Sequence, residues 1–285
     1  MINNSFFSTE ILRWFRENGR DLPWRETRDP YAIWLSEIIL QQTRIVQGWE
    51  YWERFMQTYP KVEDLAAASE DDVLKLWQGL GYYSRARNLH AAAKQIVALG
   101  SFPNTLDGIK SLKGVGDYTA AAIGSFAFDI PAAVVDGNVY RVLSRYFGID
   151  TPINSTQGKK EFAALAQSLL PASDAASYNQ GMMDFGAIQC TPQSPKCLLC
   201  PLAETCEALR CGRVEELPIK NKTVKVKTRH LSYIYIRCKS SVADGIGKSE
   251  PMVAIHRRGE GDIWQGLWEP YNVSDIKELP SFVKN

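Results

Sequence analysis

Residues 112–141 read LKGVGDYTAAAIGSFAFDIPAAVVDGNVYR, and this stretch decides the fold. A short apolar helix end leads into the turn Gly114-Val115-Gly116, and a second helix is predicted to begin at Asp117. Two glycines one residue apart allow positive φ and a close approach to a bulky partner. The first amides of the second helix have no intrahelical acceptor, so they offer an anion site. The pattern predicts a helix-hairpin-helix.

The second helix of this hairpin is rich in small residues, and the loop after it ends in a carboxylate. Three alanines and Gly124 keep the helix thin, so that another helix can pack closely against it. An apolar loop then carries Asp136, followed by Gly137 and Asn138, to the start of the next helix. The glycines alone are equally consistent with a hairpin used only for packing. The position of Asp136 beyond the hairpin favours a catalytic site.

Length and composition are typical of a soluble protein with more than one domain. A chain of 285 residues with 45% hydrophobic residues can bury a full core and is expected to form two domains. The net charge of +1 does not exclude a nucleic-acid partner, because positive charge can gather on one face. We see neither a membrane-length apolar run nor a signal peptide, and expect a cytoplasmic protein. Its six cysteines are then better explained as metal ligands than as disulfides.

One carboxylate lies within a strongly apolar helix predicted over residues 31–42. Glu37 has Ile33, Trp34 and Ile38 as its helical neighbours, so it does not lie on a clearly polar face. Burial disfavours the charged form of a carboxyl group and raises its pKa. A carboxyl group that is partly protonated near neutral pH can act as a general acid. A glutamate turned to solvent at the edge of the helix is the alternative.

Four cysteines are spaced as C-x6-C-x2-C-x5-C, at Cys190, Cys197, Cys200 and Cys206. Four thiolates in one short loop predict either a tetrahedral zinc ion or an iron–sulfur cluster. The spacing is unlike the usual pairing in zinc fingers, which favours the cluster. The remaining cysteines, Cys211 and Cys238, fall outside the pattern and are expected to bind nothing.

The segments LKGVGDYTA and VVDGNVYRV resemble the helix-hairpin-helix and the catalytic-aspartate segment of the base-excision DNA glycosylases of the endonuclease III superfamily. Within that superfamily the chain most resembles the MutY-type adenine glycosylases. SEIILQQT matches their SE-x-x-LQQT segment, and the cysteine spacing matches their [4Fe–4S] loop. The resemblance extends from Trp14 to about Tyr271.

The resemblance implies a mainly α fold, in which two all-α halves enclose the active-site cleft. A catalytic region over residues 1–212 would contain the helix-hairpin-helix and the [4Fe–4S] loop. It would comprise a helical barrel domain over about 28–132 and an iron–sulfur domain built from 1–27 plus 133–212. This arrangement predicts an active site between the two halves.

After the catalytic region, the pattern of the sequence changes. Residues 213–229 are polar, basic and without periodicity, and are predicted to be a linker. Short strands are predicted within His230–Arg237 and Met252–His256. The tryptophan segment 264–269 resembles part of a Nudix-like domain, so residues 230–285 are expected to form a truncated Nudix-like α+β domain. The chain has no Nudix catalytic box, and we expect no nucleotide hydrolysis from this part.

Cleavage of an N-glycosidic bond is chemically similar to glycoside hydrolysis, in which an acid activates the leaving group and a carboxylate faces a cationic sugar. The resemblance implies that Glu37 protonates adenine at N7, that Asp136 stabilises the sugar cation and that Asn138 orders the site. Tyr118 stands where bifunctional relatives carry a lysine, whose amine forms a Schiff base with the sugar. A tyrosine cannot form that imine. Base removal without efficient strand cleavage is therefore expected.

Further residues are implied to contact the extruded base and the base stack. The base pocket would be lined by Trp24, Arg25, Gln180 and Met183. Insertion into the stack would involve the turn residues Gln42 and Thr43 and two residues of a tight loop expected to be exposed, Leu80 and Tyr82. Without the resemblance, packing in the core explains most of these residues equally well, with Arg25 as a solvated arginine.

Contacts with the DNA backbone are expected at two places. The resemblance assigns the first to the hairpin residues Gly114, Val115 and Gly116. The second is the start of the helix predicted after the tight loop, where Arg85 and Arg87 are candidate phosphate contacts.

Together these features predict a monofunctional adenine DNA glycosylase with a [4Fe–4S] cluster. Its partner would be double-stranded DNA, from which it flips out and hydrolyses adenine mispaired with 8-oxoguanine or guanine. We expect a monomer in the cytoplasm of a bacterium, associated with the nucleoid and not with a membrane. One alternative is a bifunctional endonuclease III-type pyrimidine glycosylase and AP lyase, against which Tyr118 and the C-terminal segment argue. The other is a non-enzymatic DNA-binding iron–sulfur protein, against which Glu37 and Asp136 together argue.

Overall fold

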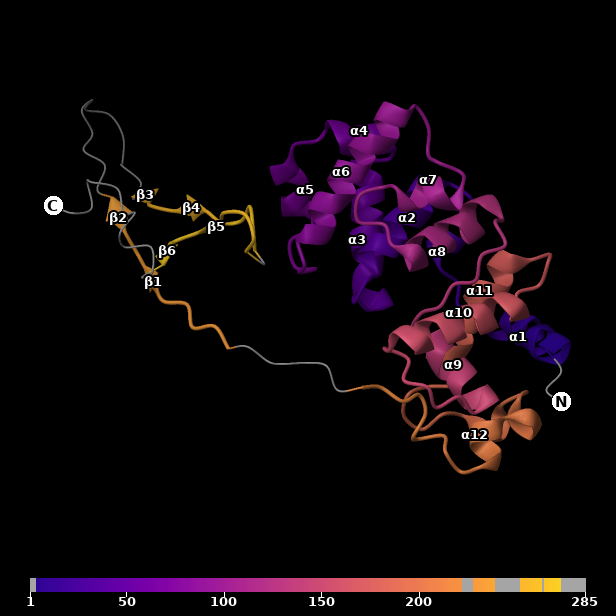
Figure 1. Ribbon diagram of the computed structural model, residues 1–285. Helices are drawn as coiled ribbons and strands as arrows, with labels where there is room; N and C mark the ends of the chain where they lie inside the picture. Colours follow the sequence, from indigo (N-terminus) through magenta and orange to yellow (C-terminus); the bar gives the residue numbers. More distant parts are fainter. Residues whose placement is uncertain (1–3, 222–227, 239–251, 263, 273–285) are drawn as a thin grey trace, which may run out of the picture. The chain divides into compact units, whose positions relative to one another are not determined.

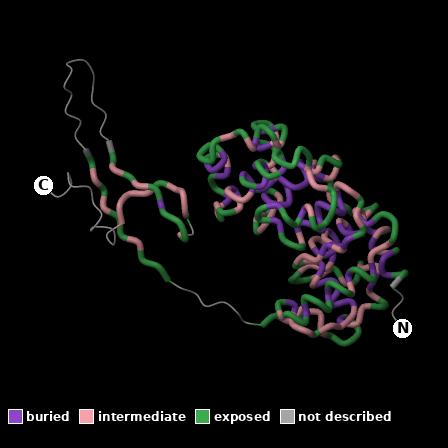
Figure 2. The backbone as a smooth tube through the Cα atoms, turned by 45° about the horizontal axis from the view of Figure 1, so that its top comes forward, coloured by how far each residue is buried: buried purple, intermediate pink, exposed green. Residues whose placement is uncertain are grey.

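The computed structural model describes residues 4–221, 228–238, 252–262 and 264–272, and the chain divides into two compact units (Figure 1). The larger unit comprises Met1–Leu80 and Arg85–Lys222, and the smaller unit comprises Gly81–Ser84 and Thr223–Asn285. Buried residues gather in the larger unit, whereas the described residues of the smaller unit are mostly exposed or half-buried (Figure 2). No helix in the described ranges is long and apolar enough to cross a membrane.

The larger unit is helical, as the mainly α prediction requires. Its N-terminal part contains α1 (Asn4–Asn18), η1 (Pro23–Arg25), α2 (Pro30–Ile39), α3 (Ile45–Thr58), α4 (Val62–Ala67), α5 (Glu70–Leu76), α6 (Ser84–Leu99), α7 (Leu106–Lys110) and α8 (Asp117–Phe128). There follow α9 (Gly137–Phe147), α10 (Thr156–Leu169), α11 (Ala175–Asp184), the π-helical η2 (Phe185–Gln189), η3 (Cys197–Leu199), η4 (Ala203–Thr205) and α12 (Glu207–Arg210).

The predicted helix-hairpin-helix is formed by α7 and α8, which pack against each other. Gly114 has φ +79°, and a Cβ atom there would lie 2.7 Å from Asn88 Cβ, so this position requires glycine. Gly116 instead has an extended backbone, with φ −98°, at the N-cap of α8. Of the two glycines, Gly114 adopts the positive φ that the sequence allows. A Cβ atom there would meet nothing within 4 Å, so the space beside the N-cap of α8 is open.

Two apolar clusters of the larger unit contain residues of the helices that carry the predicted carboxylates, one with residues of α2 and the other with residues of α9. One cluster combines Ile33 of α2 with Ala122 and Phe126 of α8. The other joins α1, α9, α10 and α11, with Phe7, Leu143 and Phe162 among its fully buried residues. Met183 packs against both clusters. The two clusters therefore meet beside the end of α11.

Small residues on α8 permit the close packing that the sequence predicts. A Cβ atom at Gly124 would lie 2.9 Å from Leu106 Cδ2, so a larger residue there would displace the Leu106 side chain of α7. The helix α2 packs on the same helix α8. It begins at Pro30, where the side chain of Asp29 accepts a hydrogen bond of 3.0 Å from the amide of Tyr31. Residues 31–39 of α2 are all buried.

Residues 213–221, which the sequence assigns to the linker, pack on the larger unit. Leu217 is only 2% exposed, and its carbonyl accepts a hydrogen bond of 3.0 Å from Arg145 Nε. The amide of Ile153 donates to the carbonyl of Ile219 over 3.0 Å. The boundary at residue 213 is therefore too early, because one buried leucine and a buried arginine hold an otherwise polar segment in place. Residues 222–227 of the predicted linker lie outside the described residues.

The smaller unit contains short antiparallel strand pairs. The strand β1 (Tyr233–Ile234) pairs with β6 (Tyr271–Asn272), β2 (Arg237–Cys238) with β3 (Met252–Val253), and β4 (His256–Arg257) with β5 (Trp268–Glu269). Arg258 is buried here and binds Asp262, Glu269 and the hydroxyl of Tyr233. These strands agree with the predicted ones, but they do not identify a Nudix-like domain. Residues 239–251, 263 and 273–285 of that predicted domain lie outside the described residues.

Candidate active site

Glu37 lies where two adjoining cavities of the larger unit meet. The narrower cavity is lined by residues that the sequence assigns to the base pocket, namely Trp24, Arg25, Gln180 and Met183. The wider cavity is a cleft lined by Glu37 together with Tyr118, Asp136 and Asn138. The structure thus brings together, from five elements and one loop, the predicted catalytic residues and the predicted base-pocket residues.

The carboxyl group of Glu37 is poised to hold a proton. Glu37 is 8% exposed on α2, and burial is the main cause that raises its pKa to about 7. The negative charge of Asp136 also raises this pKa, whereas a hydrogen bond from Tyr118 and the positive charge of Arg25 lower it. About half of the molecules would therefore carry the proton at pH 7, which suits a general acid.

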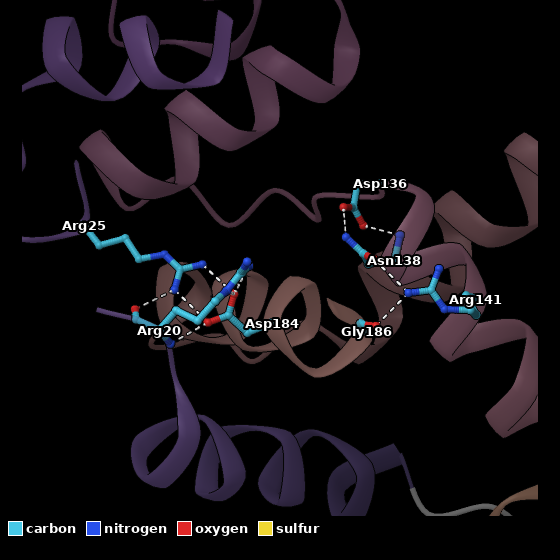
Figure 3. A network of polar contacts seen from close by, with 7 residues as sticks. All are labelled: Arg20, Arg25, Asp136, Asn138, Arg141, Asp184 and Gly186. Atoms are coloured by element: carbon cyan, nitrogen blue, oxygen red, sulfur yellow. Dashed lines mark hydrogen bonds and ion pairs between the residues drawn. The ribbon is translucent and has the colours of Figure 1, made fainter. Parts of the chain in front are cut away.

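Asp136 caps the N-terminus of α9 and is held rigidly. Its Oδ1 accepts hydrogen bonds of 2.8 Å from the amide of Asn138 and 2.7 Å from the amide of Val139. Its Oδ2 accepts one of 2.7 Å from Asn138 Nδ2, as Figure 3 shows. Burial raises the pKa of Asp136 above its ordinary value, and these hydrogen bonds oppose the rise. The three donors fix the direction in which the carboxylate faces the cleft.

Tyr118 connects the hairpin with Glu37. It lies in the first turn of α8, and its hydroxyl is hydrogen-bonded to the Glu37 carboxyl group. Burial and the charges of Glu37 and Asp136 raise the pKa of Tyr118 well above its ordinary value, so the phenol stays neutral. The hairpin therefore delivers a hydrogen-bond donor to the general-acid candidate.

A buried ion-pair cluster, which the sequence did not reveal, forms one wall of the base pocket. Asp184, the last residue of α11, has a fully buried side chain that binds Arg20 and Arg25 (Figure 3). Two nitrogens of the Arg25 guanidinium each lie 2.8 Å from a carboxylate oxygen of Asp184. Burial raises the pKa of Asp184, but the hydrogen bonds from Arg25 and Arg20 outweigh it and leave the pKa below its ordinary value. The predicted pocket residue Arg25 is thus neutralised by a carboxylate.

Two buried arginines of α9 link the catalytic side of the cleft to the cysteine loop. Arg141 Nη2 donates hydrogen bonds of 2.8 Å to Asn138 Oδ1 and 2.7 Å to the carbonyl of Gly186 (Figure 3). Its Nε donates to the carbonyl of Cys190 over 2.8 Å. Arg145, one turn later, donates to the carbonyl of Thr191 over 2.7 Å. Neither arginine was singled out from the sequence, since nothing local marks an arginine as internally bound.

The residues expected to enter the base stack differ in exposure. Gln42 is exposed in a turn with φ +57°, and Thr43 lines the cleft. Leu80 is only 7% exposed, so its expected exposure is wrong: its apolar side chain packs inside the larger unit. Tyr82 is 65% exposed and belongs to the four-residue loop grouped with the smaller unit. The phosphate contact expected of Arg85 is also not what the structure shows, because its guanidinium binds backbone carbonyls inside the unit.

Comparison with known proteins assigns the chain to a family. Residues 35–171 match the family model of the HhH-GPD superfamily base excision DNA repair proteins, and residues 190–206 match the iron-sulfur binding domain of endonuclease III. An adenine DNA glycosylase of Buchnera aphidicola (from Acyrthosiphon pisum) is 39% identical over 265 residues, covering 92% of this chain and 73% of the relative. The chain belongs to the adenine DNA glycosylase family. As a member, it is a DNA glycosylase of base-excision repair.

Another adenine DNA glycosylase and a solved glycosylase are similar over about three quarters of the chain. The mouse adenine DNA glycosylase is 42% identical over 226 residues, which cover 74% of this chain but only 44% of the mouse protein. The solved structure of a thermostable thymine-DNA glycosylase has a TM-score of 0.68 and 34% identity, and covers 73% of this chain and 97% of that chain. A similar fold thus occurs in a glycosylase that is named for a different base.

The cysteine loop fits the iron–sulfur cluster of the family. Cys190, Cys197, Cys200 and Cys206 all line one cavity, beside the buried guanidinium of Arg145. Arg145 Nη1 lies 3.4 Å from Cys190 Sγ. Within the described ranges, no group of three or more His, Cys, Asp or Glu side chains is arranged to hold a single metal ion. The donor set and the family match together indicate a [4Fe–4S] cluster.

Proposed function

We propose that this chain flips adenine out of double-stranded DNA, where adenine is mispaired with 8-oxoguanine or guanine, and hydrolyses its N-glycosidic bond without cutting the strand. The observation that carries the proposal is the position of Glu37. Its buried carboxyl group, with a pKa of about 7, lies between a pocket of the kind that holds a base and a cleft that contains Asp136. The adenine specificity rests on the curated relatives of the chain, which are adenine DNA glycosylases.

In this mechanism Glu37 acts first, as the general acid. With the base in the pocket lined by Trp24 and Met183, the carboxyl proton of Glu37 passes to N7 of adenine. Protonation makes the base a better leaving group, and the C1′–N9 bond breaks with its electron pair moving to the base. The hydrogen bond from Tyr118 to Glu37 holds the carboxyl group in place.

Asp136 then stabilises the cationic sugar that the departing base leaves. A carboxylate ~3.5 Å from such a cation, at an effective dielectric constant of ~20, gains roughly 4–5 kcal/mol. That is worth about three orders of magnitude in rate. In bulk water the same interaction would be near ~1 kcal/mol, so the burial of Asp136 matters. Water then adds to C1′ of the sugar and loses a proton, which the Glu37 carboxylate left by the first step accepts.

Tyr118 supports a monofunctional enzyme. Strand cleavage by a bifunctional glycosylase requires an amine that attacks the sugar and forms a Schiff base. No lysine lines either of the two cavities described for the larger unit. The neutral phenol of Tyr118 occupies the cleft instead, and it cannot form an imine.

The hairpin is proposed to bind the DNA backbone. The first amides of α8 have no intrahelical acceptor, and a Cβ atom at the N-cap Gly116 would meet nothing within 4 Å, so a phosphate could approach there. The four cysteines of residues 190–206 would hold the [4Fe–4S] cluster, which supplies binding energy that keeps this segment folded. One chain supplies every residue that lines the two cavities, so we propose that a monomer is active.

The test uses end-labelled duplexes that each contain one mispair. We expect base loss from A:8-oxoguanine and A:G duplexes, with strand breaks only after alkali treatment. A T:G duplex serves as the comparison, because the similar solved structure is a thymine-DNA glycosylase. Release of thymine but not adenine would overturn the proposed substrate. Nicking without alkali would favour the bifunctional alternative, and retention of both bases would contradict the glycosylase activity.

A further inference from the structure

Arg85, at the start of α6, joins two separate segments of the larger unit. Its Nη1 lies 3.1 Å and 3.0 Å from the carbonyl oxygens of Ile38 and Ile39, and it also donates to the carbonyl of Gln41. Its Nη2 donates to the carbonyl of Leu80 over 3.1 Å. One guanidinium thus binds two segments. Its Nη1 binds the end of α2 and the turn after it, and its Nη2 binds the carbonyl of Leu80.

The geometry of this contact suits arginine and no other side chain. The last carbonyls of a helix have no intrahelical partner, and a cation near them is favourable. The guanidinium also lies over the ring of Trp77, 5.1 Å from its centroid, which holds the plane in place. A lysine would keep the charge but has one nitrogen, so it cannot reach both segments in a fixed geometry.

The turn that Arg85 holds is strained and forms the rim of the cleft. Gln42 has φ +57°, a left-handed conformation that a residue with a side chain adopts only when its surroundings impose it. Gln41 and Thr43, on either side of it, line the same cleft as Glu37 and Asp136. Gln42 itself is exposed. A base that enters the cleft from a duplex therefore has to pass this turn.

We propose that Arg85 is a positioning residue, which ties the 41–43 turn to Leu80 and so fixes the rim over which the target base leaves the duplex. The inference rests on the proposed function and adds a residue that acts before the chemical step. Arg85 binds α2 only at the carbonyls that follow Glu37, and the Glu37 side chain has its own restraints in the burial of α2 and the hydrogen bond to Tyr118. If residue 85 no longer binds both segments, we expect extrusion of the base to be slower, whereas cleavage of the N-glycosidic bond should be unaffected.

The experiment compares Arg85→Lys with the parent protein on two substrates, under single-turnover conditions. One is a duplex with an A:8-oxoguanine mispair, and the other has the same sequence with the adenine in a short unpaired bubble. Loss of one or two charge-assisted hydrogen bonds predicts release from the duplex slowed on the order of 10- to 100-fold. Release from the bubble should change by less than about threefold, because the base there is already unpaired.

Arg54→Lys is the matched control. Arg54 also lies over an aromatic ring, that of Tyr51 at 4.1 Å, but it is exposed on α3 and does not line the cleft. This control should leave both rates unchanged. Arg85→Gln, whose amide can reach only one of the two segments, provides a second variant should Arg85→Lys fail to fold.

Equal slowing on duplex and bubble, or no slowing on the duplex, would overturn the role of Arg85 while adenine release by the parent protein still stands. A parent protein that releases adenine from neither substrate would instead refute the proposed function, and this inference with it. An increase in 2-aminopurine fluorescence, with that base at the target position, measures extrusion directly. It should be slower with Arg85→Lys by the same factor as base release from the duplex.

Discussion

Replacing Glu37 with glutamine should abolish activity and, at alkaline pH, stabilise the protein. The amide keeps the shape of the side chain and can still accept a hydrogen bond from Tyr118, but it has no acidic proton to donate. General acid catalysis typically contributes ~10²- to 10⁴-fold, so we expect a loss of that order in base release. In the parent protein, the rate should fall as the pH rises above about 7, the pKa of Glu37. The variant should lack this dependence.

The stability change follows from the same pKa. Burial raises the pKa of Glu37 from 4.5 to about 7, so between these values the folded protein binds a proton that the unfolded chain does not. The contribution of Glu37 to stability is therefore fully present below pH 4.5 and is lost as the pH rises through about 7. At 1.36 kcal/mol per pKa unit, the loss amounts to roughly 3 kcal/mol at pH 8. Glutamine, which is never charged, avoids it.

Thermal unfolding of the two proteins at pH 8 and at pH 4.5 measures this difference. For a unit of about 200 residues, ~3 kcal/mol corresponds to a rise in Tm of roughly 6–12 °C at pH 8, and the gain should shrink at pH 4.5. Glu50→Gln, at an exposed glutamate of α3, should change Tm little at either pH. Equal Tm values of Glu37→Gln and the parent at pH 8 would refute the raised pKa of a buried Glu37. Turnover of the variant within about tenfold of the parent would refute its role as the general acid.

Three further predictions concern the pocket wall, the cleft and the cysteine loop. Asp184→Asn leaves Arg20 and Arg25 without their buried carboxylate partner, and we expect the free energy of unfolding to fall by about 3–5 kcal/mol. Because the charge of Arg25 is then no longer neutralised, it should lower the pKa of Glu37 further and shift the pH–rate profile to lower pH. An unshifted pH–rate profile would show that Asp184 does not reduce the effect of the Arg25 charge on Glu37. Tyr118→Lys places an amine in the cleft, so borohydride should trap a covalent protein–DNA adduct, and absence of trapping would show that residue 118 does not reach the sugar. Metal analysis should find about four iron and four sulfide per chain. Removal of the iron with a chelator should lower Tm, and so should the substitution Cys197→Ser. A colourless protein with one zinc ion would refute the cluster.

The features predicted correctly from the sequence are those that depend on near neighbours along the chain. The hairpin turn, the apolar helix around Glu37, the helix start at Asp136 and the cysteine spacing are each contained within a few turns of sequence. Hydrophobic periodicity, turn residues and metal-ligand spacing are local signals, so one sequence is sufficient to find them. Local signals failed where a second segment decides the outcome. Leu80, expected to be exposed in its tight loop, is only 7% exposed because it packs inside the larger unit.

The arginines show most clearly what only the tertiary structure decided. Arg85 has the sequence context of a surface arginine at a helix start, yet it binds carbonyls more than 40 positions away in the chain. Arg25 and Asp184 are 159 positions apart and form one buried ion pair. A charged side chain can be buried only where a partner is supplied, and that partner comes from whichever segment the fold places beside it. The sequence by itself determined the family and the cysteine loop and predicted Glu37 and Asp136 as the catalytic carboxylates, whereas long-range packing decided which arginines bind buried carboxylates and carbonyls.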